Sequence, residues 1–435
     1  TSVREKAAKM PRVGRRQGPR PPSAYGGTHM ASAAPRPKVH IAPMQCYTNR
    51  YLRFLLRLMS ADCILWTEME KAADVLAQPE RRLANDDMEH PLVLQLGGDQ
   101  RSALTAATRL ARERGGFCEV NLNCGCPSIT TGGADFGAAL MLRARHTREL
   151  IEAIGDATGG EMAVSVKCRI GVHDALLDDG SVPGDSYDAL REFVETVCTD
   201  TVCSHAVIHA RSAILGGLSP SKNRQVPPLR YDYVHELAAD MPELRVTLNG
   251  GLALDGPWRD EAAWGGGSLD GVMLGRSILR RPLDVWGVDS TPMTSARAPS
   301  RAAALERYAR HTCRLLSTRD HGRGAVHVAD VLAPLALVAQ QLVDEEDREE
   351  TGSESGILDS AEQRDVFGAV WEASAAILSE STDGQKAPPP ASMVLAEAEA
   401  NGEGLPMRKL TRMLGKGMGK KEANKLARNR AEALS

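Results

Sequence analysis

The sequence predicts an α/β protein, a (β/α)8 TIM barrel followed by a smaller α-helical domain. Eight short apolar runs alternate with helix-like stretches between residues 39 and 285, which is the strand count of a closed barrel. A doubly wound sheet would more often use five or six strands. The predicted strands span residues 39–44, 63–69, 91–96, 118–123, 162–170, 205–210, 244–250 and 270–275.

The chain after Trp286 has a different character. A linker-like segment leads into residues 301–317 and 331–346, which have helical patterns. We therefore expect a barrel domain at 39–290 and a helical domain at 300–435. An acidic insert at about 317–402, expected to be flexible, would interrupt the helical domain.

The first 38 residues differ from both domains. They lack apolar periodicity and carry nine Lys/Arg against one acid, so we expect residues 1–38 to form a disordered basic leader. The same composition fits an organellar transit peptide.

The overall composition is that of an ordinary soluble protein. The 435 residues are 42% hydrophobic and 25% charged, with a net charge of −3. No run approaches the roughly 18 apolar residues of a membrane helix. The nine cysteines are scattered through apolar runs, which favours reduced thiols over a disulfide framework. We expect a reducing compartment, cytoplasmic or organellar, and neither secretion nor a membrane.

Two strand ends predict a phosphate site. Asn249-Gly250-Gly251 and Gly275-Arg276 follow the seventh and eighth predicted strands, where barrels commonly bind phosphate. Glycines let backbone N–H groups approach an anion, and Arg276 would add a charge-assisted contact. Tight turns between strand and helix are the alternative explanation for these glycines.

Three other strand residues fit a flavin beside this phosphate site. Lys167 needs a partner because burying an unpaired ammonium costs free energy. In a flavin site it would face the N1/O2 edge of the flavin ring. An ion pair with Glu68 is a competing and compatible explanation. Gln95 could hydrogen-bond the pyrimidine edge or only satisfy backbone groups. His209 could hold flavin or phosphate, or it could be an ordinary core histidine.

The motif Cys124-Gly-Cys126 predicts one working thiol. Its spacing is too short for a zinc site or a thioredoxin-type pair, and we expect no metal. Cys126 stands at the end of the fourth strand, before Pro127 and a glycine-rich loop. A free thiol is mostly protonated at neutral pH, so Cys126 could act as a general acid while Cys124 packs in the core.

Together these motifs resemble the tRNA-dihydrouridine synthases, and among them the bacterial A-type group. The most specific segment runs from His209 to Leu229, and a weaker match returns near the C-terminus. The matching segments are, in order, APM, TEM, LQLGG, NLNCGCPS, VKCRIG, IHAR…GLSPSKNRQVPPL, LNGGL, GVMLGRS and LTRMLGKGMGKKEANKLARNRA.

The resemblance implies FMN at the barrel mouth, NADPH as the reductant, and reduction of the C5=C6 bond of a flipped-out D-loop uridine of tRNA. Position 20 and/or 20a is the expected target. Hydride would pass from flavin N5 to C6, and Cys126 would protonate C5. The implied cofactor-binding residues are Pro43, Met44, Gln95, Lys167, His209, Asn249, Gly250, Gly251, Gly275 and Arg276.

The resemblance also implies a tRNA-binding helical domain in a monomeric protein. Three departures bear on the docking of tRNA: a longer loop after the fifth strand, the 317–402 region, and Asn424 at a position where the bacterial pattern has arginine. The implied tRNA contacts are Asn123, Arg211, Lys222, Arg224, Arg412, Lys425 and Arg428.

Two other functions compete with this one. A flavin oxidoreductase of a small pyrimidine would share the barrel, FMN and a catalytic acid or base. It would not explain the loop GLSPSKNRQVPPL or the basic tail, where residues 405–435 carry nine Lys/Arg against two glutamates. A tRNA-binding protein without catalysis is disfavoured by the presence of both Cys126 and Lys167.

Overall fold

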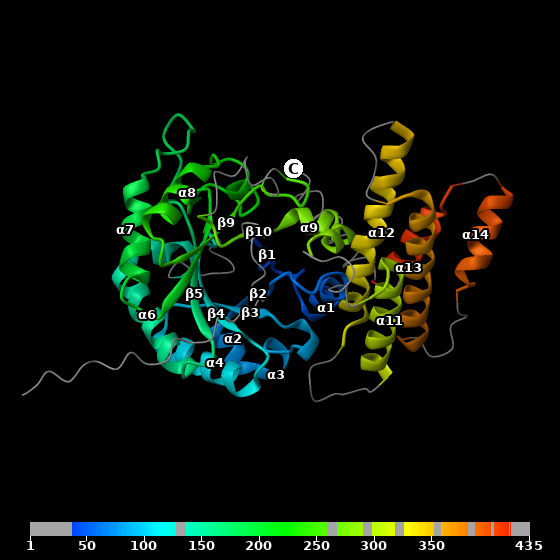
Figure 1. Cartoon of the computed structure of the whole chain (residues 1–435), viewed down its shortest axis with the longest axis horizontal. Coiled ribbons are helices and arrows are strands. Elements are labelled where there is room, and N and C mark those ends of the chain that lie inside the picture. The colour runs from blue at the N-terminus through cyan, green and yellow to red at the C-terminus, as the bar shows by residue number, and fades with distance from the viewer. Residues whose placement is uncertain are drawn as a thin grey trace, which may run out of the picture.

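The structure is a computed structural model in which a barrel stands beside a helical bundle (Figure 1). It describes residues 37–127, 136–256, 258, 268–289, 298–317, 326–351, 358–381, 388–401, 404–416 and 418, with only the backbone for 347–351. The expected leader therefore lies almost entirely outside the described residues. Lys38, which we assigned to the leader, instead begins the first strand, and its Nζ pairs with Asp270 Oδ1 at 2.9 Å.

Eight parallel strands form the barrel, which confirms the predicted fold. The sheet order is β1-β10-β9-β7-β5-β4-β3-β2. Backbone bonds from Ile41 N to Ile64 O and from Ile64 N to Val39 O, both 2.8 Å, join its two edges. The strands are β1 (Lys38–Ile41), β2 (Leu65–Lys71), β3 (Leu92–Gly97), β4 (Glu119–Cys124), β5 (Ala163–Arg169), β7 (Cys203–His209), β9 (Arg245–Asn249) and β10 (Gly271–Leu274).

Amphipathic helices cover the outside of the barrel. In α6, for example, Leu150, Ile151, Ile154 and Ala157 are buried, which is the spacing of one helical face. The Asn49 side chain caps α1 by accepting from Tyr51 N and Leu52 N. The helices are α1 (Arg50–Met59), α2 (Ala72–Ala77), α3 (Pro79–Arg82), α4 (Arg101–Arg114), α6 (Ala144–Thr158), α7 (Tyr187–Cys198), α8 (Tyr231–Asp240) and α9 (Arg276–Arg280).

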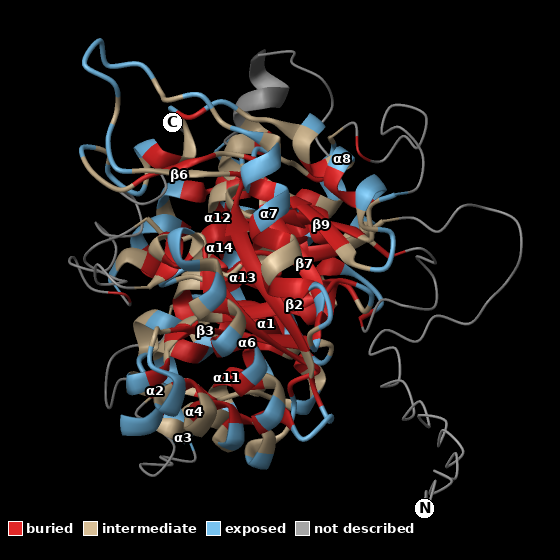
Figure 2. Ribbon diagram, turned by 90° about the vertical axis from the view of Figure 1, so that its left-hand side faces the viewer, coloured by how far each residue is buried: buried red, intermediate tan, exposed pale blue. Residues whose placement is uncertain are grey.

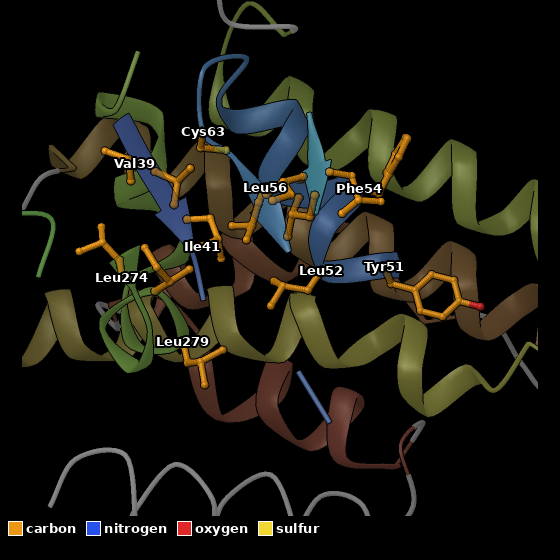
Figure 3. Packing of buried hydrophobic residues seen from close by; sticks show 14 of the residues in the cluster. Val39, Ile41, Tyr51, Leu52, Phe54, Leu56, Cys63, Leu274 and Leu279 are labelled. Atoms are coloured by element: carbon orange, nitrogen blue, oxygen red, sulfur yellow. The ribbon is translucent and has the colours of Figure 1, made fainter. Parts of the chain in front are cut away.

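Strand side chains divide into an outer and an inner set. Outward-facing residues join the helices in one large core, and Figure 3 shows Val39 and Ile41 of β1 among them, near Leu52 and Leu56 of α1. The inner apolar cluster is small, and the polar residues Glu119, Asn121 and Asn123 alternate with outward-facing residues along β4. The barrel interior is therefore unusually polar.

A small parallel sheet that the sequence did not predict links two barrel loops. It pairs β6 (Val172–His173) with β8 (Ala213–Ile214). The two strands belong to the loops after β5 and β7, which emerge at the carboxyl ends of the barrel strands. They therefore tie together two loops on the face where barrels place their sites.

The second domain is a bundle of α11 (Arg301–Ser317), α12 (Val328–Thr351), α13 (Ser360–Ser381) and α14 (Ala391–Ala400), followed by a further helical segment at 407–416. Both helical patterns predicted from the sequence are confirmed. Much of the region at about 317–402, expected as a flexible insert, consists of helices that pack in the bundle. Val331, Leu335, Val338 and Leu342 of α12 are buried on one face, and α13 packs along α11.

The bundle docks against the barrel through α1. Phe54 of α1 stacks on His311 of α11 with ring centroids 3.9 Å apart. Arg281 forms an ion pair with Glu345 of α12 at 2.7 Å, and Gln341 Nε2 of the same helix donates to Asp284 Oδ1 at 2.7 Å. Figure 2 shows how widely buried residues extend through the molecule. Among the described helices, none has the length and apolar character needed to cross a bilayer.

Candidate active site

A cavity of about 540 Å³ opens at the carboxyl ends of the barrel strands. Such a concave site at this end of a barrel is where catalysis is expected. All the residues predicted to bind the cofactor line it, and so do Asn123, Arg224 and the predicted acid Cys126. The structure therefore brings together in one cavity residues from strands spread over more than half of the chain.

Lys167 lines this cavity. Its Nζ donates to Asn249 Oδ1 at 2.9 Å, and Asn249 Nδ2 in turn donates to Met273 O at 2.8 Å. The alternative ion pair with Glu68 is not what the structure shows, because the Glu68 carboxylate accepts from Cys46 N instead. Burial lowers the pKa of Lys167 from 10.5 to about 7, with Arg169 as a further cause. The site is therefore suited to stabilising an anion beside Lys167.

Gln95 is held by side chains rather than by backbone groups. Its Nε2 donates to Asn121 Oδ1 at 2.8 Å, and its Oε1 accepts from Asn123 Nδ2 at 2.9 Å. The alternative in which the Gln95 side chain satisfies backbone groups is thus not observed. Both Gln95 and Asn123 line the cavity, so their remaining hydrogen-bonding groups are placed to meet a ligand.

Cys126 lies at the cavity wall on a loop that Asn123 holds. Asn123 Oδ1 accepts from Gly125 N at 3.2 Å and from Cys126 N at 3.0 Å. The Cys126 side chain is half-buried, whereas Cys124 is fully buried in the core, and burial raises the pKa of Cys124. The geometry therefore leaves Cys126 as the thiol of this motif that a ligand can reach.

Arg169 is a polar residue at the end of the fifth predicted strand to which we assigned no role from the sequence. It is buried at the cavity, and its Nε donates to Gly125 O at 3.1 Å. Its Nη1 donates to Ser212 O at 3.1 Å and to Asn223 O at 3.0 Å. Burial lowers its pKa to about 9. Arg169 thus joins the thiol loop to the loop that follows β7 and adds positive charge to the cavity.

The glycines after β9 form a cradle that a side chain would fill. Gly250 and Gly251 have φ of +121° and +65°, which L side chains rarely adopt. A Cβ at Gly250 would lie 2.8 Å from His209 Cδ2, and one at Gly251 would lie 2.9 Å from Leu229 Cδ1. Backbone N–H groups can approach a ligand closely here, as a phosphate site requires.

Positive charge gathers around this cradle. Arg224, Arg276 and Arg280 line the same cavity, and Arg280 was not predicted from the sequence. His209 also lines it, and its pKa lies well below the ordinary value because of burial and then the nearby cations Arg169 and Lys167. The imidazole is therefore neutral, and the net positive charge comes from arginine and lysine, which suits a phosphate dianion.

The predicted tRNA contacts have different surroundings. Arg211 is not a lining residue, and its Nη1 donates to Gln225 O and Pro227 O, so it braces the loop after β7. Lys222 is exposed in that loop, and Arg412 is exposed on the last described helical turn. Lys425 and Arg428, like Asn424, lie outside the described residues.

The fold and the cavity define a (β/α)8-barrel enzyme with its site at the carboxyl ends of the strands. A family model described as dihydrouridine synthase (Dus) matches residues 40–356. A tRNA-dihydrouridine(20/20a) synthase of Pseudomonas syringae pv. tomato is 42% identical over 268 residues, 61% of this chain and 75% of that protein. One from Pseudomonas aeruginosa is 41% identical over 279 residues, 64% of this chain and 79% of that protein. The chain belongs to the dihydrouridine synthase family.

Proposed function

We propose that this enzyme uses FMN and NADPH to reduce the C5=C6 bond of a tRNA D-loop uridine, at position 20 and/or 20a, to dihydrouridine. The observation that carries the proposal is the shared cavity of Cys126, Lys167 and the glycine cradle. One thiol, one buried ammonium and a phosphate cradle are the groups that such a reaction requires. The relatives named above support the choice of substrate.

The residues of the cavity fit FMN. Gly250, Gly251 and Gly275 would present backbone N–H groups to the phosphate, and Arg276 would add charge. Lys167 would stand at the N1/O2 edge of the ring, where an ammonium stabilises the reduced form, and Gln95 at the pyrimidine edge. When bound, FMN supplies the hydride that adds to C6 of the uracil ring.

The remaining chemistry belongs to side chains of this protein. Cys126 donates a proton to C5 of the uracil ring and is left as a thiolate. Asn123 orients the base, and its hold on the backbone of the thiol loop keeps Cys126 in place. Lys167 and Arg169 line the same cavity as Cys126 and would add positive charge there.

The substrate is reached by base flipping, because the C5=C6 bond is inaccessible inside folded tRNA. Lys222 and Arg224 would contact tRNA from the loop after β7. Arg211 would act there through the loop that it braces. Arg412, Lys425 and Arg428 would contact phosphates from the second domain.

The test is formation of dihydrouridine on unmodified tRNA by the purified protein with NADPH. Wild type should form product, and mapping the product identifies the uridine. Cys126→Ala should lose at least about a hundredfold in rate, as expected for loss of a general acid. Cys313→Ala, which removes a half-buried thiol of the helical domain, is the matched control and should remain active.

Other outcomes would redirect the proposal. A yellow protein that NADPH reduces but that forms no dihydrouridine on any tRNA would point to a small pyrimidine substrate. Full activity in Cys126→Ala would remove Cys126 from the reaction.

A further inference from the structure

A column of polar side chains runs inside the barrel from its floor to the thiol loop. Glu119, Asn121 and Asn123 alternate along β4, so all three face the interior. Strand register places Gln95 of β3 and Ser165 of β5 on either side of Asn121. Barrel interiors are usually filled by branched apolar side chains, whereas polar side chains occupy these positions here.

The members of the column are joined end to end by hydrogen bonds. Asn123 Nδ2 donates to Gln95 Oε1 at 2.9 Å, and Gln95 Nε2 donates to Asn121 Oδ1 at 2.8 Å. Asn121 Nδ2 donates to Ser165 Oγ at 2.8 Å, and Ser165 hydrogen-bonds the Glu119 carboxylate. All of these side chains are buried.

The upper end of the column fixes its direction. Gly125 N and Cys126 N are backbone donors, so the Asn123 atom that faces them must be the oxygen. The Asn123 nitrogen then points to Gln95, and every amide below must donate downward with its nitrogen. Each side-chain amide has a donor nitrogen at one end and an acceptor oxygen at the other. If one amide in the column were turned around, two donors or two acceptors would therefore face each other.

The lower end requires the same direction. Burial alone would raise the pKa of Glu119, but His205, hydrogen-bonded at 3.0 Å, and Arg245, at 3.3 Å, bring it below the ordinary value. Glu119 is therefore an ionised carboxylate, which only accepts hydrogen bonds. The Ser165 hydroxyl must donate to it and accept from Asn121.

We propose that Glu119 is a positioning residue that anchors the lower end of this column and, together with the backbone donors of the thiol loop at the upper end, holds its direction, so that Gln95 and Asn123 each offer an N–H donor to the cavity. Each of these amide nitrogens has two hydrogens, and the column uses one of them. Donors at these places match the carbonyl oxygens of flavin and uracil pyrimidine rings. Cytosine carries an amino donor where uracil carries O4, so the column favours uridine over cytidine. This inference rests on the proposed function.

The experiment compares two substitutions within the column with a control substitution outside it. Glu119→Gln replaces the acceptor-only anchor, and Ser165→Ala breaks the column while leaving Glu119 and its ion pairs with His205 and Arg245 in place. Thr247→Val removes the hydroxyl that pairs with His205 Nε2 at 2.8 Å, a buried bond of the same cluster outside the column. The assays are kcat/KM on tRNA with uridine or cytidine at the target position, and the Kd for FMN.

Both column variants should lower kcat/KM for uridine about tenfold and reduce the preference for uridine over cytidine, as expected when a hydrogen-bonded group can reverse. Their Kd for FMN should rise, whereas Thr247→Val should stay within about twofold of wild type. If both column variants kept the wild-type kcat/KM, the wild-type preference for uridine and the wild-type Kd for FMN, the proposal would be overturned.

A separate measurement covers the case in which the proposed function itself fails. If wild type forms no dihydrouridine, the direction of the column can still be read from a neutron crystal structure of the deuterated protein, which distinguishes amide nitrogen from oxygen. Amide nitrogens pointing from Asn123 toward Glu119 would support the inference. A reversed amide, or a protonated Glu119 that donates to Ser165, would refute it.

Discussion

Replacing Lys167 by methionine should stabilise the flavin-free protein while impairing its reaction. The pKa of Lys167 falls from 10.5 to about 7 on burial, and each pKa unit corresponds to about 1.4 kcal/mol, so the buried charge costs about 5 kcal/mol well below pH 7. Methionine removes this cost but leaves Asn249 Oδ1 without its donor, a penalty of about 1–3 kcal/mol. We expect the free energy of unfolding at pH 6 to rise by the difference, about 2–4 kcal/mol.

The sign of the pH dependence is fixed by linkage. Between pH 7 and 10.5 native Lys167 is neutral while the unfolded chain still binds a proton, so wild-type stability rises with pH across this window. The advantage of Lys167→Met should therefore be greatest below pH 7, and by pH 10.5 the variant should be less stable than wild type by about 1–3 kcal/mol, because only the loss of the hydrogen bond to Asn249 remains. Urea denaturation across this range measures it, and Lys222→Met, an exposed lysine, should show no such advantage. A Lys167→Met protein less stable than wild type at pH 6 would refute the reasoning.

Three further predictions concern other parts of the molecule. Arg412→Gln should lower the slope of log affinity for tRNA against log salt by about 0.7 to 0.9, and an unchanged slope would remove Arg412 from the phosphate contacts. Phe54→Ala should lower the free energy of unfolding by about 3 kcal/mol, measured in urea, because Phe54 is buried against His311 where the domains meet; a loss below about 1 kcal/mol would contradict this. Burial lowers the pKa of His40 from 6.5 to about 3, so the unfolded chain binds a proton that native His40 does not. Wild-type stability should then fall more steeply than that of His40→Gln between pH 6 and 4, by about 1.4 kcal/mol per pH unit, and equal slopes would exclude His40 as the source.

The strands and the strand-end residues could be predicted because both leave a local signal in the sequence. Each barrel strand is a short apolar run, and topology places polar groups such as Lys167 and Asn249 at a common end. The small sheet of β6 and β8 escaped prediction because two-residue strands have no measurable period. The helix that contains Val331 and Leu335 was predicted from its apolar spacing, but α13 and α14 were missed because the surrounding acidic residues suggested a flexible insert.

The roles of single side chains were less predictable when their partners were backbone atoms. Arg169 binds carbonyls of Gly125, Ser212 and Asn223, and a carbonyl carries no residue-specific signal in the sequence. Arg211 followed a histidine at a strand end and suggested a ligand contact, yet its guanidinium is occupied by loop carbonyls. Only the folded loops show where these acceptors lie.

The junction between barrel and bundle has a consequence for building hybrid proteins. Arg276 at the cavity and Arg281 at the junction stand within six residues of each other, and α9, which carries Arg276, also packs against α12. A fusion boundary placed directly after β10 would exchange the wall of the cavity together with the docking surface. A boundary after Asp289, whose carboxylate accepts from Ala61 N at 3.0 Å on the barrel, would keep the cavity whole. A bundle transplanted there would still need partners for Arg281 and Asp284.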